Sequence, residues 1–136
     1  MKPKILVVED NEANMVLLRD ILAIIGSEVL EATTGQEGLR LAREEKPQLI
    51  LMDIQLPDID GITLTRLLKQ DPATSHIPII AVTSYAYEKE KDLFSQAGGD
   101  GYLTKPIEIE SLLKVVTQFI RGEKIHVGEA QNTSSR

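Results

Sequence analysis

The stretch Leu49-Ile50-Leu51-Met52-Asp53 (residues 49–53) joins four consecutive apolar residues to a single acid. A continuous apolar run rich in branched side chains is typical of a strand that helices cover on both faces, as in a parallel sheet. Two further runs have the same character, Ile5-Leu6-Val7-Val8 and Ile79-Ile80-Ala81-Val82. We therefore predict three central strands, one of which ends at Asp53.

Two weaker segments are predicted to be edge strands. The segment 28–32, Glu-Val-Leu-Glu-Ala, partly alternates between polar and apolar side chains. The segment 101–104 is short and begins with glycine. Partial alternation and short length fit the edge of a sheet better than its centre. The predicted sheet thus has five strands.

Segments with helical periodicity separate these strands. A first helix is predicted after Asn11, and Thr34-Gly35-Gln36-Glu37 has the spacing of a capping box, so a second helix begins there and ends before Pro47. A third helix is predicted to begin at Gly61, a fourth to run from Glu88 to Ala97, and a fifth to lie near the end of the chain. The apolar positions expected to face the sheet are Leu17, Leu18, Ile21, Leu22 and Ile25 in the first helix, Leu64, Leu67 and Leu68 in the third, and Leu112, Val116, Phe119 and Ile120 in the last.

The regular alternation of strand and helix predicts an α/β fold with a parallel sheet and right-handed crossovers. Five such units are too few to close an eight-stranded barrel, so an open, doubly wound sheet is expected. In that architecture ligands bind beyond the carboxyl ends of the strands. The residues that follow each strand are therefore the candidates for a functional site.

Charged and polar residues follow four of the predicted strands. Glu9-Asp10 comes after the first strand, Asp53 after the third, Thr83 at the end of the fourth and Lys105 after the fifth. Three carboxylates at neighbouring strand ends repel one another, and a hard divalent cation such as Mg²⁺, which prefers oxygen ligands, removes that conflict. A cation, an ammonium group, a hydroxyl donor and a carboxylate nucleophile are together the groups needed to hold a phosphoryl group.

The composition excludes several other classes of protein. The 136-residue chain is 42% hydrophobic, carries a formal net charge of −6, and contains no cysteine. An acidic chain with scattered Lys and Arg does not favour direct nucleic-acid binding, and disulfides or thiolate metal sites are unavailable. The longest early apolar run, residues 5–8, is too short for a signal peptide or a membrane span, so we expect a cytoplasmic protein.

With these residues in this order, the chain resembles the receiver domains of two-component signalling over residues 4–121. The matching residues are Glu9-Asp10, Asp53, Pro57, Asp60-Gly61, Thr83-Ser84, Tyr102 and Lys105-Pro106. The resemblance implies a flavodoxin-like doubly wound (βα)5 three-layer sandwich with a parallel five-stranded sheet of order 2-1-3-4-5. It also implies a cis Lys105-Pro106 peptide bond.

The resemblance further implies phosphorelay signal transduction by a regulatory domain rather than by an enzyme. Asp53 is expected to accept a phosphoryl group, in the presence of Mg²⁺, from a sensor histidine kinase or a histidine phosphotransfer protein. Asp10, Asp53 and the backbone carbonyl of Gln55 are the implied metal ligands, with Glu9 acting chiefly through a metal-bound water. Lys105 is expected to neutralise phosphoryl oxygens, and the domain to assist its own phosphorylation and autodephosphorylation.

Two residues are implied as the switch that follows phosphorylation. Thr83 is expected to move toward the phosphate and Tyr102 to turn inward, which reshapes a surface of the fourth and fifth helices for a downstream protein target. We expect a monomer, with dimerisation on phosphorylation left open.

The resemblance also implies that a helix of a phosphotransfer partner docks across the first helix and the loop before Pro106. The predicted contacts are Asn11, Asn14, Met15 and Pro106. Met15 is expected to lie off the apolar face of this helix, where an exposed methionine adapts well to a partner.

Residues 1–122 are predicted to form the receiver domain and residues 123–136 a flexible tail, because the last six residues contain no apolar side chain. The sequence does not separate a complete single-domain regulator from a receiver excised from a larger protein such as a hybrid kinase.

Three rival functions fit the sequence less well than this interpretation. A flavodoxin-like electron carrier needs a loop rich in Ser, Thr and Gly after the first strand, where this chain has two acids. Phosphatases with an aspartyl nucleophile carry an Asp-x-Asp pattern. In this chain the position of the second aspartate, two residues after Asp53, is Gln55. A degenerate receiver that serves only as a scaffold has no need for the acids or for Lys105.

Overall fold

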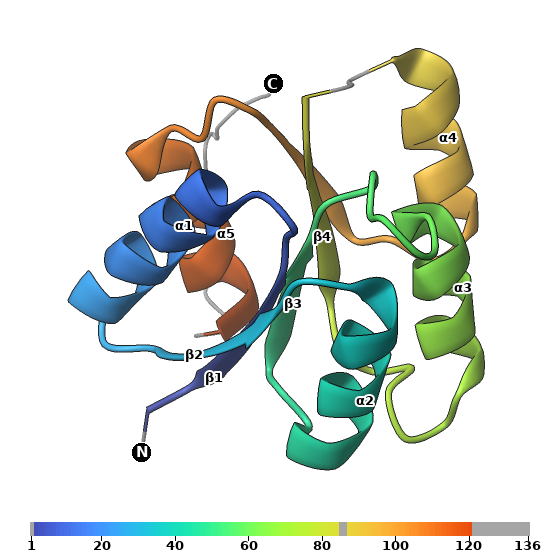
Figure 1. Ribbon diagram of the computed structural model, residues 1–136, viewed down its shortest axis with the longest axis horizontal. Coiled ribbons are helices and arrows are strands. Elements are labelled where there is room, and N and C mark those ends of the chain that lie inside the picture. The colour runs from blue at the N-terminus through green and yellow to red at the C-terminus, as the bar shows by residue number, and fades with distance from the viewer. Residues whose placement is uncertain (1, 85–86, 121–136) are drawn as a thin grey trace.

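The structure is a computed structural model, which describes residues 2–84 and 87–120. Strands and helices alternate along the chain (Figure 1). Their bounds are β1 Lys4–Val8, α1 Glu12–Ile24, β2 Glu28–Ala32, α2 Gly35–Glu45, β3 Leu49–Met52, α3 Gly61–Gln70, β4 Ile79–Thr83, α4 Glu88–Gln96, β5 Gly101–Thr104 and α5 Ile109–Ile120.

The five strands form one parallel sheet in the order β2-β1-β3-β4-β5. The predicted order is confirmed, with β1, β3 and β4 in the centre and β2 and β5 at the edges, as in flavodoxin-like proteins. The register aligns Val8 of β1 with Met52 of β3, and the Asp53 amide donates to the Val8 carbonyl at 2.9 Å. These two strands therefore end level with each other.

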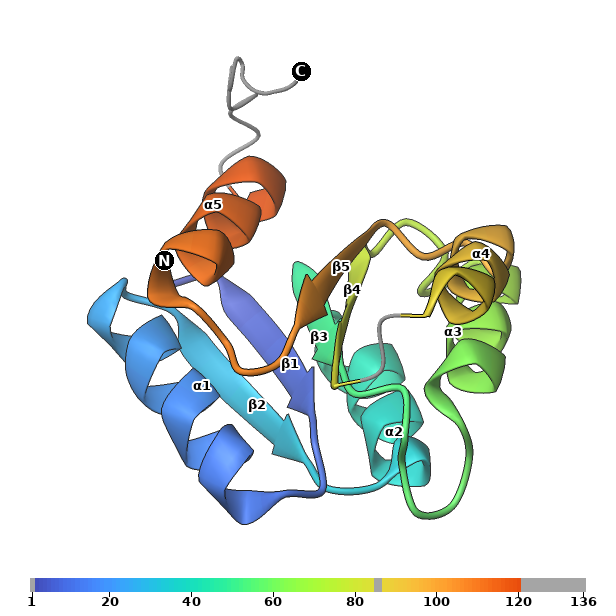
Figure 2. The same cartoon turned by 90° about the horizontal axis from the view of Figure 1, so that it is seen from above.

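Helices cover both faces of the sheet and make three layers. Helices α1 and α5 lie on one face and α2, α3 and α4 on the other (Figures 1 and 2). Successive side chains of a strand point to opposite faces, so Ile5 and Val7 pack in the layer of α1 and α5, whereas Leu6 and Val8 pack beneath α2 and α3. The continuous apolar runs thus supply two separate cores.

Two predictions about the first helix are wrong. Met15 is only 4% exposed and belongs to the core beneath α1, whereas Leu17 is 41% exposed. Met15 precedes Leu18 by three residues and Leu22 by seven, which is the spacing of one helical face, and Leu17 lies about 100° away from Leu18 around the axis. Leu67 of α3 is likewise 39% exposed instead of buried.

The predicted starts of the helices agree with their caps. Asn11 caps α1, and the Thr34 hydroxyl oxygen accepts from the Glu37 amide at 3.1 Å. Glu37 reaches back to the amide of Thr33 at 3.1 Å, one residue earlier than a standard capping box requires. Helix α2 ends where Lys46 adopts a left-handed conformation with φ of 49°.

No helix in residues 2–84 and 87–120 is long and apolar enough to cross a bilayer. The predicted flexible tail, residues 123–136, lies outside the described residues.

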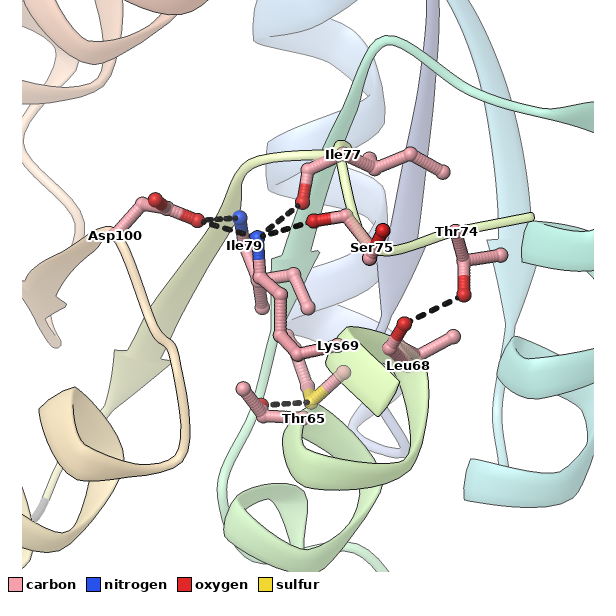
Figure 3. A network of polar contacts seen from close by, with 9 residues as sticks. Thr65, Leu68, Lys69, Thr74, Ser75, Ile77, Ile79 and Asp100 are labelled. Carbon is pink, nitrogen blue, oxygen red and sulfur yellow. Dashed lines mark hydrogen bonds and ion pairs between the residues drawn. The ribbon is translucent and has the colours of Figure 1, made fainter. Parts of the chain in front are cut away.

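At the end of the sheet where β4 begins, Lys69 connects α3 to the segments that precede β4 and β5 (Figure 3). The Lys69 ammonium at the end of α3 donates to the Ile77 carbonyl at 2.8 Å and forms an ion pair with Asp100 Oδ2 at 3.0 Å. Asp100 Oδ2 also accepts from the Ile79 amide at 2.9 Å, and the Asp100 amide donates to the Ile79 carbonyl at 2.9 Å. Both main-chain groups of the first residue of β4 are therefore bonded to Asp100.

Replacing Asp100 tests how much this network contributes to stability. In Asp100→Ala the amide of Ile79, a residue with no exposed surface, loses its acceptor, so we expect the free energy of unfolding to fall by about 2 kcal/mol. Urea unfolding followed by circular dichroism measures this change. Asp100→Asn keeps an acceptor and loses only the charge, so its loss is expected to be smaller; equal losses in the two variants would contradict the assignment.

Candidate functional site

The carboxyl ends of four strands bring the predicted site residues to one edge of the sheet. Glu9 and Asp10 follow β1, Asp53 follows β3, Thr83 is the last residue of β4, and Lys105 follows β5. Because β1, β3, β4 and β5 are neighbours in a parallel sheet, their ends all lie at the same edge.

Three carboxylates form the centre of this site. One oxygen from each of Glu9, Asp10 and Asp53 lies within 4.8 Å of the others. Glu9 is 1% exposed and Asp53 8% exposed, whereas Asp10 is exposed to solvent. Burying two acids beside a third is unfavourable unless a positive charge accompanies them.

Lys105 supplies one such charge within the chain. Its ammonium lies 2.8 Å from Glu9 Oε1 and 3.0 Å from Asp53 Oδ2, and the lysine side chain is 12% exposed. The contact with Asp53 is also a hydrogen bond, whereas Glu9 Oε1 has no partner in hydrogen-bonding geometry, so its contact is an ion pair only. The repulsion predicted from the sequence is thus partly offset by Lys105 before any metal binds.

The pKa values of these groups reflect burial and ion pairing. Burial raises the pKa of Glu9, against the opposing effects of Lys105 and of the Asn11 amide, which donates to Glu9 Oε2 at 3.1 Å. Burial by itself lowers the pKa of Lys105, but the two carboxylates outweigh it, so that pKa is raised above its usual value. Lys105 therefore remains a cation while it contacts both acids.

The set of donor atoms at this edge fits a hard divalent cation. Carboxylate oxygens are the ligands that Mg²⁺ prefers, and the ion usually retains several waters. The exposed Asp10 leaves the cluster open to water, and the ion pair at Glu9 Oε1 leaves this buried oxygen without a directed hydrogen bond. Glu9, Asp10 and Asp53 could therefore hold such an ion.

The loop from β3 to α3 packs directly against Asp53. The Gln55 amide donates to Asp53 Oδ1 at 3.0 Å, and the Gly61 amide donates to the Ile54 carbonyl at 2.6 Å. A Cβ atom on Gly61 would lie 2.7 Å from the carbonyl oxygen of Asp53, which only glycine avoids. Asp60 caps α3 by accepting from the Thr63 amide at 2.9 Å.

One residue of this loop has a contact that the sequence does not predict. Asp58 Oδ1 accepts from the Gly35 amide at 2.7 Å and Oδ2 from the Gln36 amide at 2.9 Å. These two hydrogen bonds lower the pKa of Asp58. The sequence shows an acid in a loop, but its partners lie more than twenty residues away on another helix, so no local pattern identifies them.

The two predicted switch residues lie in β4 and β5. Thr83 is 1% exposed, and its carbonyl accepts from the Lys105 amide at 2.9 Å. Tyr102 is aligned with Ala81 in the sheet, and its ring packs edge-on against Phe94 of α4, with the ring centroids 6.0 Å apart. The ring of Tyr102 is therefore in contact with α4.

Three of the four predicted partner contacts are accessible. Asn11 and Pro106 are exposed and Asn14 is half-buried, whereas Met15 is buried and is excluded from such a surface. The Lys105-Pro106 peptide bond is cis, as the resemblance implied.

Comparisons with known proteins agree with this geometry. The sequence profile of the response regulator receiver domain matches residues 5–117. The chain is 41% identical over 120 residues to the polar-differentiation response regulator DivK of Brucella anthropi, covering 88% of this chain and 98% of the relative.

Two solved structures show the same fold. The receiver domain of the sensor histidine kinase PA1611 of Pseudomonas aeruginosa, which has a magnesium ion coordinated in its active-site cleft, is 31% identical with a TM-score of 0.83, covering 89% of this chain and 99% of that one. A CheY-like receiver domain protein of Methanospirillum hungatei is 31% identical with a TM-score of 0.84, covering 90% and 96%. With the sheet order and the acidic cluster, these matches show that the chain belongs to the family of response regulator receiver domains.

Proposed function

We propose that this receiver domain accepts a phosphoryl group on Asp53 in a Mg²⁺-dependent phosphorelay. The observation that carries the proposal is that Asp53 shares one site with two further carboxylates and with the Lys105 ammonium, 3.0 Å away. An ammonium group and a metal-binding acidic cluster beside one carboxylate are the elements of phosphoryl transfer.

Asp10, Asp53 and the Gln55 carbonyl would hold Mg²⁺, with Glu9 acting chiefly through a metal-bound water, and the ion would supply positive charge for the phosphoryl oxygens. The acidic cluster of this chain supports that assignment, as does the magnesium ion in the related PA1611 receiver domain. Asp10 and Glu9 would thus act only in metal binding, whereas Asp53 would bind the metal and also accept the phosphoryl group.

In the transfer, a carboxylate oxygen of Asp53 attacks the phosphorus of a phosphohistidine. The new P–O bond forms an acyl phosphate while the P–N bond breaks and its electron pair stays on the imidazole of the donor. Lys105, already in contact with Asp53, neutralises a phosphoryl oxygen, and the Thr83 hydroxyl donates to another. The same arrangement lets the domain assist its own phosphorylation and the later hydrolysis of the acyl phosphate.

Phosphorylation of Asp53 changes the surface formed by α4 and α5. Thr83 moves toward the phosphate, and Tyr102, which packs on Phe94 of α4, turns inward, so that a surface of α4 and α5 is offered to a downstream protein. The partner that delivers the phosphoryl group, a histidine kinase or a histidine phosphotransfer protein in the cytoplasm, docks on Asn11, Asn14 and Pro106. Val16 and Leu17, the exposed apolar residues of α1 next to Met15, extend this docking surface.

Phosphorylation is expected to require Asp53. Wild-type protein incubated with acetyl phosphate and Mg²⁺ should gain one phosphoryl group, detected by intact mass spectrometry, and Asp53→Asn should gain none because an amide is not a nucleophile of comparable strength. Asp20→Asn, which changes an exposed acid on α1, is the matched control and should behave as wild type. Phosphorylation that persists in Asp53→Asn, or that is unchanged after Mg²⁺ is removed with a chelator, would rule out the proposal.

Removing Lys105 is expected to destabilise the metal-free domain. Lys105→Ala leaves the Glu9 carboxylate buried without its counter-charge, so we expect a loss of about 3 kcal/mol at neutral pH. Thermal unfolding should show a lower Tm, with part of the loss recovered in excess Mg²⁺ because the cation replaces the missing charge. Lys114→Ala, an exposed lysine on α5, should melt as wild type; an unchanged Tm in Lys105→Ala would reject the role assigned to this ion pair.

A substitution on α1 separates partner docking from phosphoryl chemistry. Asn14→Arg places a long charged side chain on the proposed docking surface and should slow transfer from a purified histidine phosphotransfer protein that phosphorylates the wild type. Its phosphorylation by acetyl phosphate should be unchanged, because the small donor does not use the surface. Gln118→Arg, an exposed site on α5, is the control for added charge; equal transfer rates in Asn14→Arg and wild type would remove Asn14 from the surface.

A further inference from the structure

The loop that carries Gln55 is bonded to a helix other than the one it precedes. Both oxygens of Asp58 accept main-chain hydrogen bonds from the first turn of α2, from Gly35 at 2.7 Å and from Gln36 at 2.9 Å. A carboxylate in this position satisfies two amides that a helix leaves unpaired, and it also interacts favourably with the positive end of the helix dipole.

Close packing accompanies these hydrogen bonds. A Cβ atom on Gly35 would overlap with Cγ2 of Ile59, the residue after Asp58. Gly35 is buried at this contact, so the main chain of α2 and the β3–α3 loop lie directly against each other. The loop is thus fixed to α2 by both polar and steric contacts.

The same loop also contacts Asp53. The Gln55 amide donates to Asp53 Oδ1 at 3.0 Å, and only two residues separate Gln55 from Asp58. At its other end the loop is held by the Gly61 amide, which donates to the Ile54 carbonyl. A displacement of Asp58 from α2 therefore moves the segment whose main chain touches the Asp53 carboxylate.

We propose that Asp58 is a positioning residue for the metal site, and that it acts by clamping the β3–α3 loop to the N-terminus of α2. The clamp holds the Gln55 amide on Asp53 and so fixes the residue whose carbonyl would bind the ion. This inference rests on the proposed function, in which the Gln55 carbonyl is a ligand of Mg²⁺.

A structural role alone makes a different prediction. If Asp58 were merely a cap for α2, its loss would destabilise the helix without changing the site. The Thr34 hydroxyl caps the same helix through the Glu37 amide and makes none of the described hydrogen bonds to the β3–α3 loop. Thr34→Ala is therefore the matched control, because it weakens the same helix end and leaves the clamp intact.

The first experiment measures Mg²⁺ affinity by isothermal titration calorimetry. Asp58→Asn is expected to raise the Mg²⁺ dissociation constant about tenfold, as is usual when a group that orients a metal ligand is lost. Gly35→Ala, which pushes the loop away while keeping Asp58, should change the constant in the same direction. Thr34→Ala should bind as wild type, and urea unfolding verifies that each variant is folded.

The second experiment is amide hydrogen exchange on the metal-free protein. Exchange of the Gln55 amide should accelerate in Asp58→Asn and stay unchanged in Thr34→Ala, because the Asp58 carboxylate bonds the loop to α2 and the Thr34 hydroxyl does not. Unchanged Mg²⁺ affinity and unchanged Gln55 exchange in Asp58→Asn would overturn the inference. If wild type binds no Mg²⁺, the proposed function fails instead, and the exchange data alone decide whether the clamp exists.

Discussion

The contact of the Lys105 ammonium with Glu9 and Asp53 is the interaction on which the rest of this site depends. It joins the ends of β1, β3 and β5 and provides a counter-charge for two acids that are almost entirely buried. Without that charge, the parallel sheet would gather carboxylates at one edge at a large cost in desolvation. The arrangement places the ammonium group of Lys105 directly against the Asp53 carboxylate.

Several contacts hold the loop between β3 and α3 beside Asp53. Gly61 packs against the main chain at Asp53, Asp60 caps α3, and Asp58 bonds to the first turn of α2. Thr83 and Tyr102 lie on the neighbouring strands β4 and β5, and the ring of Tyr102 packs against Phe94 of α4. The loop beside Asp53 is thus held by contacts with α2 and α3, whereas Tyr102 contacts α4.

The sequence predicted individual elements well because their signals are local. The apolar runs of β1, β3 and β4 and the cap of α2 each depend on a few adjacent residues, and all appear where they were predicted. The orientation of α1 was less accurate. Met15 was assigned to the surface and Leu17 to the core, because the exposed face of a helix depends on how the whole helix is rotated against the sheet, and a short apolar pattern leaves that rotation uncertain within one residue.

The sequence by itself determined the alternation of strands and helices and the identity of the residues at the strand ends, because apolar periodicity and the geometry of a parallel sheet suffice for both. Only the tertiary structure decided which charges meet. That Lys105 lies between Glu9 and Asp53, and that Asp58 bonds to α2, depends on the packing of segments far apart in the chain, whose pairing no local pattern records.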